Sequence, residues 1–195
     1  STTVRDISEQ QAAEARIHEL NANLEAQVQL RTAELNQLNL LLSSVLRAAT
    51  EVSIIATGLD GKIRLFNRGA ERILGYAADD IVGKSTTERF FVPEELAARS
   101  WELSLETGRP IEGRQALIWK PENEGAENRE WTLQRRDGSR FIANVLITAM
   151  RDSDGQLTGF LGIAFDSTRR KNAERELASS LATTQAILDT APNPI

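Results

Sequence analysis

Few residues in this chain could carry out catalysis or hold a metal ion. The 195 residues include one histidine, His18, and no cysteine. The lack of cysteine excludes disulfides, thiolate nucleophiles and cysteine-based metal sites. No pair of carboxylates, no nucleophile beside a base and no metal-ligand cluster appears along the sequence. We therefore predict that this segment is not an enzyme.

The single histidine lies on a predicted helix, within the run Ile17-His18-Glu19-Leu20. A histidine followed by glutamate and leucine on a helix resembles the phosphoacceptor box of sensor histidine kinases. The basic residue and the proline that follow in that pattern are absent, and no nucleotide-binding glycine motif follows downstream. We interpret His18 as a solvated residue of the helix surface.

A long helix is predicted over residues 6–49, which contain no proline or glycine and are rich in good helix formers. Apolar residues recur there at steps of three and four, with Arg31 in one position and one extra step of four. A helix of about 44 residues spans on the order of 65 Å. We therefore favour a parallel dimeric coiled coil over a helix packed on its own domain. The predicted dimer seam consists of Ile17, Leu20, Leu24, Val28, Leu35, Leu38, Leu42 and Val45.

The strongest sheet signal lies in residues 131–168. Asp137-Gly138 and Asp154-Gly155 separate runs rich in β-branched and aromatic residues, which predicts two hairpins with type I′ turns. One face of the middle strand is mixed, so we expect another part of the chain or a partner subunit to cover part of it. The other face is wholly apolar and should contact the core, with Phe141, Ala143, Val145, Ile147 and Ala149.

A further hairpin is predicted nearer the N-terminus. Residues 52–57 and 62–67 have strand composition and are joined by Asp60-Gly61. Asn67 can cap a short helix after the second strand, and Gly75 can end that helix.

The middle of the chain is predicted to be mainly helical. A helix should begin at Pro93 and end at Gly108. Residues 111–120 fit either a strand or a short helix, and residues 121–128 should form an exposed loop. The element order predicts an α+β fold, a five-stranded antiparallel sheet with helices on one face, flanked by long coiled-coil linker helices.

Several motifs, in order, resemble those of a PAS domain over about residues 50–176. They are DGKIRLFNRGAERILGY at 60–76, IVGK at 81–84, EWTLQRRDGS at 130–139, GFLGI at 159–163 and DSTRRKNAE at 166–174. The resemblance implies a regulatory sensor module of a multidomain signalling protein, such as a sensor histidine kinase or diguanylate cyclase. It also implies that Asp166 and Thr168, in the exit motif, relay a conformational signal to an output domain. The alternatives are a flavin-binding redox sensor, a structural spacer that dimerises without a ligand, and part of a transcription regulator.

The two ends of the chain resemble each other. Residues 6–14 are similar to residues 166–174, and residues 186–195 are similar to residues 44–52. This repeat suggests a segment of a tandem array. The predicted parts are the exit segment of a preceding PAS-like domain at 1–14, a coiled-coil linker helix at 15–49, the PAS domain at 50–168, a second linker helix at 169–190 and the start of a following domain at 191–195.

The resemblance also limits the cofactors. PAS relatives that hold haem usually ligate it through histidine, and those that form a flavin photoadduct need cysteine, but residues 50–168 contain neither. No cofactor is predicted, although non-covalent flavin stays open. The candidate ligand pocket comprises Asn67, Trp101, Trp131, Arg135, Phe141 and Val145. For the tryptophans the alternative to ligand binding is core packing, and for Asn67 it is helix capping.

Composition bears on partners and location. A net charge of −5 and a pI near 5.1 argue against nucleic acid as a partner. No apolar run approaches the roughly 18 residues that cross a membrane, and no signal peptide is visible, so a cytoplasmic setting is expected. The expected partners are a second copy of the chain, joined through parallel helices, and neighbouring PAS-like domains of the same chain.

Overall fold

The computed structural model describes residues 2–168 and 171–173, with side chains from residue 14 onward. The predicted start of a following domain and nearly all of the predicted second linker helix lie outside the described residues. The chain divides into two compact units, one up to Val45 and one from Leu46 onward.

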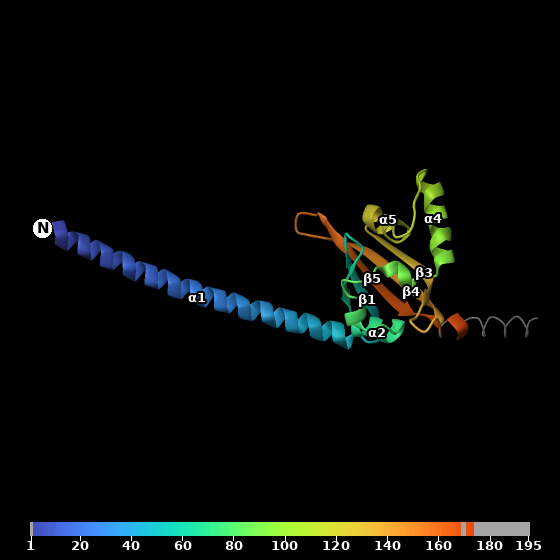
Figure 1. Ribbon diagram of the computed structural model, residues 1–195, viewed down its shortest axis with the longest axis horizontal. Helices are drawn as coiled ribbons and strands as arrows, with labels where there is room; N and C mark the ends of the chain where they lie inside the picture. The colour runs from blue at the N-terminus through green and yellow to red at the C-terminus, as the bar shows by residue number, and fades with distance from the viewer. Residues whose placement is uncertain (1, 169–170, 174–195) are drawn as a thin grey trace, which may run out of the picture. The chain divides into compact units, whose positions relative to one another are not determined.

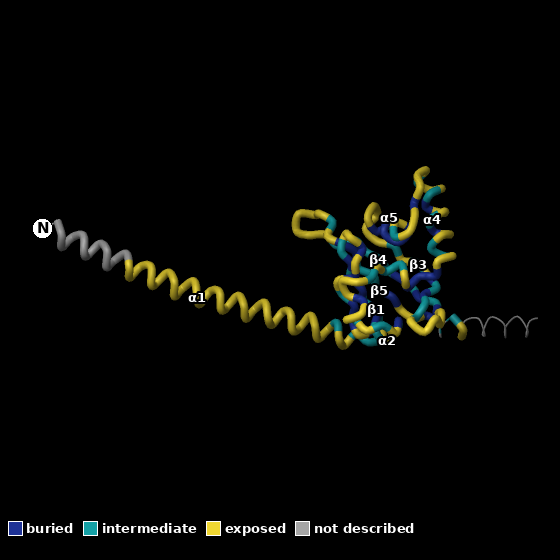
Figure 2. The backbone as a smooth tube through the Cα atoms, viewed as in Figure 1, coloured by how far each residue is buried: buried dark blue, intermediate teal, exposed yellow. Residues whose placement is uncertain are grey.

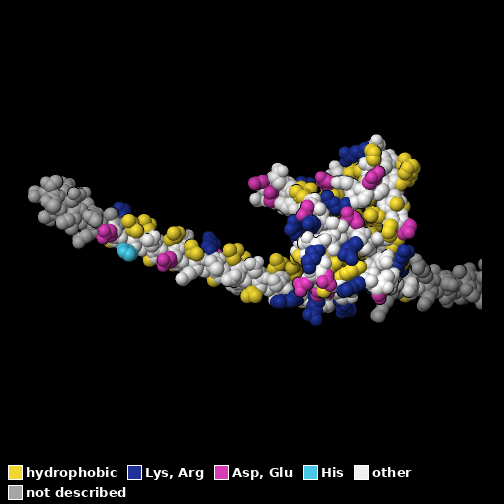
Figure 3. All heavy atoms as spheres, in the orientation of Figure 1, with side chains coloured by type: hydrophobic (Ala, Val, Ile, Leu, Met, Phe, Trp, Pro, Cys, Tyr) yellow, Lys and Arg dark blue, Asp and Glu magenta, His cyan; other side chains and the backbone are white. Residues whose placement is uncertain are grey.

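Helix α1 runs from Thr2 to Ala48 without interruption. It continues through residue 14, so the predicted boundary between an exit segment and a linker helix stays a prediction. Almost every described side chain of the helix is exposed, as the yellow tube in Figure 2 shows. The eight predicted seam residues are between 56% and 63% exposed, and Figure 3 shows yellow hydrophobic side chains spaced along the helix.

The domain is built on one five-stranded antiparallel sheet with the strand order β2-β1-β5-β4-β3 (Figure 1). The last strand in the sequence therefore lies at the centre, between the first strand and the long hairpin. This arrangement confirms the predicted α+β fold. The strands are β1 Ser53–Gly58, β2 Ile63–Phe66, β3 Ala126–Gln134, β4 Arg140–Arg151 and β5 Leu157–Asp166.

Helices cover the core face of this sheet. On β4, Phe141, Ala143 and Val145 are buried, as the alternation of apolar residues predicts. They form one cluster with apolar residues of the helices, including Leu74 and Leu117. The helices are α2 Arg68–Leu74, α3 Ala78–Ile81, the 3-10 turn η1 Thr87–Phe90, α4 Pro93–Thr107 and α5 Gln115–Glu124.

The hairpin turns differ from the predicted type I′. Among the described residues, only glycines have positive φ, with Gly138 at 83° and Gly155 at 78°. A type I′ turn needs positive φ at both central residues, so that prediction was wrong. Instead, the amide of Gly138 donates to the carbonyl of Arg135 at 3.0 Å, and the Asp137 carboxylate accepts from the Ser139 amide at 2.9 Å. This is a longer loop in which the aspartate side chain, rather than its backbone conformation, stabilises the turn.

The prediction of an exposed loop over residues 121–128 is also wrong. Residues 121–124 form the last turn of α5, with Pro121 buried inside the helix, and β3 already begins at Ala126. The ladder to β4 starts at the pair Ala126 and Thr148. Cross-strand hydrogen bonds and burial of the proline ring outweigh the weak local propensity of this polar segment.

Candidate functional site

Two joints connect the domain to its flanking segments, and the first centres on Asn67. This residue follows β2, caps α2 and is only 6% exposed. Its Oδ1 accepts hydrogen bonds from the amides of Ala70 at 2.8 Å and Ile54 at 2.9 Å. Its Nδ2 donates to the carbonyls of Ala49 at 2.9 Å and Val52 at 3.1 Å. One buried amide thus links α2, β1 and the segment just after α1, in addition to the capping role expected for it.

The entry joint also reaches the last turn of α1, because Asn67 Nδ2 lies 3.3 Å from the carbonyl oxygen of Leu46. Gly69 makes this close approach possible. A Cβ atom at Gly69 would lie 2.6 Å from the carbonyl oxygen of Ala49 and closer still to that of Val52. Glycine is therefore required here for space, and no positive φ is involved.

The second joint lies where β5 leaves the sheet. Arg135 Nη2 pairs with Asp166 Oδ2 at 2.8 Å, and Arg135 Nη1 donates to the carbonyl of Ile73 at 2.9 Å. The guanidinium carbon also lies 3.9 Å from the ring centre of Phe141. A half-buried arginine thus ties the exit residue Asp166 to β3, to β4 and to the end of α2.

Thr168 and Ser167 extend this exit joint to β4. The amide of Ile142 donates to Thr168 Oγ1 at 3.1 Å, and the amide of Ser167 donates to the carbonyl of Ile142 at 2.9 Å. Asp166 Oδ1 accepts from the Thr168 amide at 3.0 Å, a local side-chain bond to the second residue along the chain. The amide of Lys171 donates to the carbonyl of Ser167 at 3.0 Å, which is the spacing of a first helical turn.

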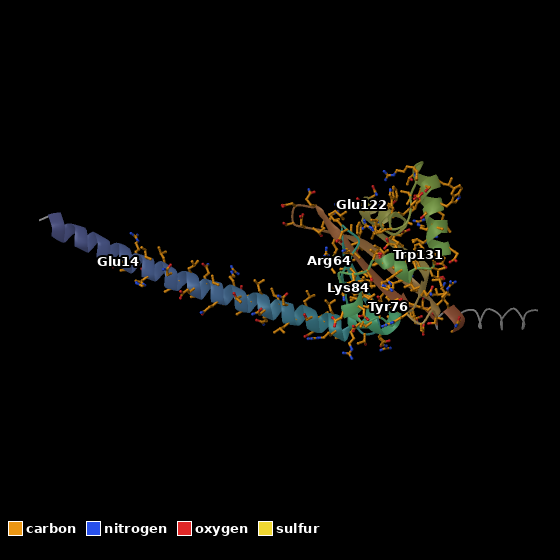
Figure 4. All side chains as sticks on the ribbon, viewed as in Figure 1. Glu14, Arg64, Tyr76, Lys84, Glu122 and Trp131 are labelled. Atoms are coloured by element: carbon orange, nitrogen blue, oxygen red, sulfur yellow. The ribbon has the colours of Figure 1, made fainter. Side chains whose placement is uncertain are left out.

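The structure distributes the six predicted pocket residues over several places. Asn67 and Arg135 belong to the two joints, and Phe141 lies beneath Arg135. Trp101 is 69% exposed on the outer side of α4. Trp131, labelled in Figure 4, is 4% exposed on β3 and packs edge-on against the ring of Phe91 at 5.1 Å.

Val145, the sixth, lines an internal cavity of about 60 Å³ between the sheet and the helices. The lining comes from β1, β3, β4 and β5 on one side and from α2, η1 and α5 on the other. Most of it is apolar, and it includes Ile55, Phe90, Leu117, Phe160 and Ala164.

This cavity is small compared with typical ligand pockets. About 60 Å³ is room for roughly four to six waters. Pockets for drug-sized ligands have volumes of about 300–1,000 Å³. At this volume the cavity suits a smaller molecule.

A buried ion cluster on α4 and β3 was missed in the sequence. Arg99 is 5% exposed; its Nη1 pairs with Glu102 at 3.0 Å and its Nη2 pairs with Glu127. Hydrogen bonds from Arg129 and Arg99 lower the pKa of Glu102. Burial raises the pKa of Glu127 despite the nearby arginines. The available signal was spacing, because Arg99 lies three residues after Leu96, on the apolar stripe of the helix.

Arg114, which also lines the cavity, was missed for a different reason. It lies in the stretch for which strand and helix were both open, so the direction of its side chain could not be predicted.

Metal ions and membranes are the remaining classes of partner. Among the side chains that the structure describes, those of residues 14–168 and 171–173, no three ligating groups lie close enough to hold a metal ion. Of the helices that the structure describes, none has both the length and the apolar character needed to span a bilayer.

Comparison with known proteins places this geometry in a family. A family model described as PAS domain matches residues 51–169. The Two-component system protein A of Emericella nidulans is 37% identical over 114 residues, which are 58% of this chain and 14% of that protein. The C4-dicarboxylate transport sensor protein DctS of Rhodobacter capsulatus is 30% identical over 127 residues, 64% of this chain and 17% of that protein. This chain thus spans about a sixth of the length of these relatives.

Solved structures are similar at lower identity. The PAS domain of a protein from Colwellia psychrerythraea is 23% identical with a TM-score of 0.49, over 63% of this chain and 93% of that one. The PAS domain of an HTR-like protein from Haloarcula marismortui is 20% identical with a TM-score of 0.49, over 70% and 97%. The family match at residues 51–169 covers every strand of the sheet, as well as Asn67 of the first joint and Arg135, Asp166 and Thr168 of the second. The chain therefore belongs to the PAS domain family.

Proposed function

We propose that this chain is a regulatory sensor module that dimerises through α1 and relays a conformational change to an output domain elsewhere in the protein. The observation that carries the relay is the exit joint. Asp166 pairs with Arg135, which directly follows β3, and Ser167 and Thr168 are hydrogen-bonded to Ile142 of β4. A shift of the sheet would therefore move the chain that follows β5 instead of being lost in a slack connection.

Dimerisation is supported by the apolar side chains of α1. Eight residues at heptad spacing are exposed in the single chain. A helix with a narrow apolar seam gains stability by burying that seam against a second helix. A parallel arrangement would leave both copies of the domain at the same end of the pair, where their outputs can meet.

The named relatives support a signalling role. One is called a two-component system protein and the other a sensor protein. We propose that the parent of this chain is likewise a signalling protein, with the catalytic or regulatory output outside residues 1–195. The chain itself would sense and transmit but would not catalyse.

Light scattering tests the dimer. At tens of micromolar, the chain of 21.6 kDa should have twice its monomer mass. Leu24→Lys combined with Leu38→Lys should shift the mass toward monomer, because each change places a charge in the seam. Gln29→Lys combined with Gln37→Lys adds the same charge beside the seam and should leave the dimer intact. A monomeric unmodified chain, or equal effects of the two double variants, would contradict the proposal.

A further inference from the structure

The internal cavity has one charged side chain in its lining, Arg114. Its Nη2 donates to the carbonyl of Leu59 at 3.1 Å. Its Nη1 is buried and has no hydrogen-bond partner in the part of the chain that the structure describes. A buried donor without an acceptor is destabilising, and a charged donor more so. Arg114 therefore lines the cavity and carries one buried N–H group without an acceptor.

The fold holds Arg114 in this position. Its guanidinium packs against the turn between β1 and β2, where a Cβ atom on Gly61 would lie 2.9 Å from Arg114 Cδ and 3.0 Å from Arg114 Nε. No carboxylate of a described residue pairs with Arg114. The positive charge is thus uncompensated, which favours an anionic partner.

The rest of the lining limits what that anion can be. Apart from Arg114, its polar side chains are the hydroxyls of Ser53, Thr57 and Thr87. A second negative charge on the ligand would have no cation to pair with inside the cavity. Room for about four to six waters corresponds to a molecule of about three to five carbons.

We propose that the cavity binds a short-chain monocarboxylate. The carboxylate accepts from Arg114 Nη1, and the alkyl chain packs against apolar residues such as Val145 and Phe160. This deepens the sensor function proposed above, because it names the class of molecule sensed. Binding at this position would act on β4 and β5, whose ends carry the exit joint.

Calorimetry of the 195-residue chain with sodium butanoate tests the chemical class. Butanoate should bind and raise the melting temperature relative to equal sodium chloride. Butan-1-ol, which lacks the charge, and succinate, which carries a second charge, should each bind at least tenfold more weakly. Absence of butanoate binding, or equal binding of butan-1-ol, would overturn the proposal.

Substitutions test whether Arg114 binds the carboxylate. Arg114→Gln should weaken butanoate binding at least tenfold, whereas Arg140→Gln removes an exposed arginine at the start of β4 and should leave binding unchanged. Equal binding by the two variants would overturn the assignment. Should Arg114→Gln fail to fold, amide chemical shifts of the unmodified chain decide. Butanoate should perturb Gly162 and Ala164 most, and changes confined to exposed residues would reject the cavity.

The binding measurement is independent of the dimer. Butanoate binding by a chain that light scattering shows to be monomeric would support the ligand and reject dimerisation. A dimer that does not bind butanoate would support dimerisation and reject the ligand.

Discussion

The buried side chain of Asn67 contacts five backbone groups, and these contacts join the start of α2 to β1 and to residues 46–52. Asn67→Ala should lower the free energy of unfolding by about 2 kcal/mol or more. Loss of a helix cap alone costs roughly 0.5–2 kcal/mol, and the Ile54 amide would also lose its acceptor. Urea denaturation measures the change. Asn128→Ala, on an exposed position of β3, should stay within about 0.5 kcal/mol, and a similar loss in both variants would argue against the joint.

Asp166 is the matching residue at the exit. Asp166→Ala removes the ion pair to Arg135 and the bond to the Thr168 amide. We expect a local loss of about 0.5–2 kcal/mol, seen as faster hydrogen exchange after β5, with the exchange of β1 unchanged. Asp154→Ala, in the exposed β4–β5 turn, is the control. Faster exchange throughout the sheet would mean that Asp166 supports the whole fold and is not specific to the exit.

At the scale of elements, one buried ion pair holds α4 to β3. The side chains of Arg99 and Glu127 are 6% and 14% exposed. Arg99→Met should cost about 3–5 kcal/mol, because it leaves Glu127 buried without its partner. Chemical denaturation with circular dichroism measures this loss.

Two further variants test whether the loss of stability comes from breaking the ion pair between Arg99 and Glu127 and whether it depends on burial of the pair. Arg99→Met combined with Glu127→Leu should recover most of the lost stability, because apolar residues of similar size can replace a buried pair. Arg64→Met breaks the exposed pair with Asp60, whose side chains are 61% and 44% exposed, and should cost about 0–1 kcal/mol. If the double variant is as unstable as Arg99→Met alone, the pair is not the reason for the loss.

At the scale of the whole molecule, the same cluster makes stability depend on pH. Burial raises the pKa of Glu127, so the folded state binds that proton more tightly than the unfolded state does. Its contribution is present below the ordinary carboxylate pKa and is lost as pH rises through the raised value. The pKa of Glu102 is lowered by Arg129 and Arg99. Its contribution is present above the ordinary pKa and is lost as pH falls through the lowered value.

Urea denaturation from pH 3 to 7 measures these opposite slopes. As pH rises, the stability of the unmodified chain relative to Glu127→Gln should fall, whereas its stability relative to Glu102→Gln should rise. Glu112→Gln, on an exposed loop position, should show neither trend. Slopes of the same sign for the first two variants would be incompatible with the assigned directions.

The sequence by itself determined the features that depend on local patterns. The long helix, the three hairpins and the Asn67 cap all follow from periodicity or from turn and capping chemistry between near neighbours. The apolar face of β4 follows from strict alternation. These signals are strong because they need no knowledge of what lies across the fold.

Tertiary structure alone decided the features that depend on contacts between distant residues. The central place of β5 follows from pairing with β1, about a hundred residues earlier, and residues 126–128 became strand because β4 offered hydrogen bonds there. The direction of Arg114 was equally hidden, since a side chain's face has no periodic signal in an element of uncertain type. The cavity is a gap left by the packing of seven elements, and its size depends on all of their positions together.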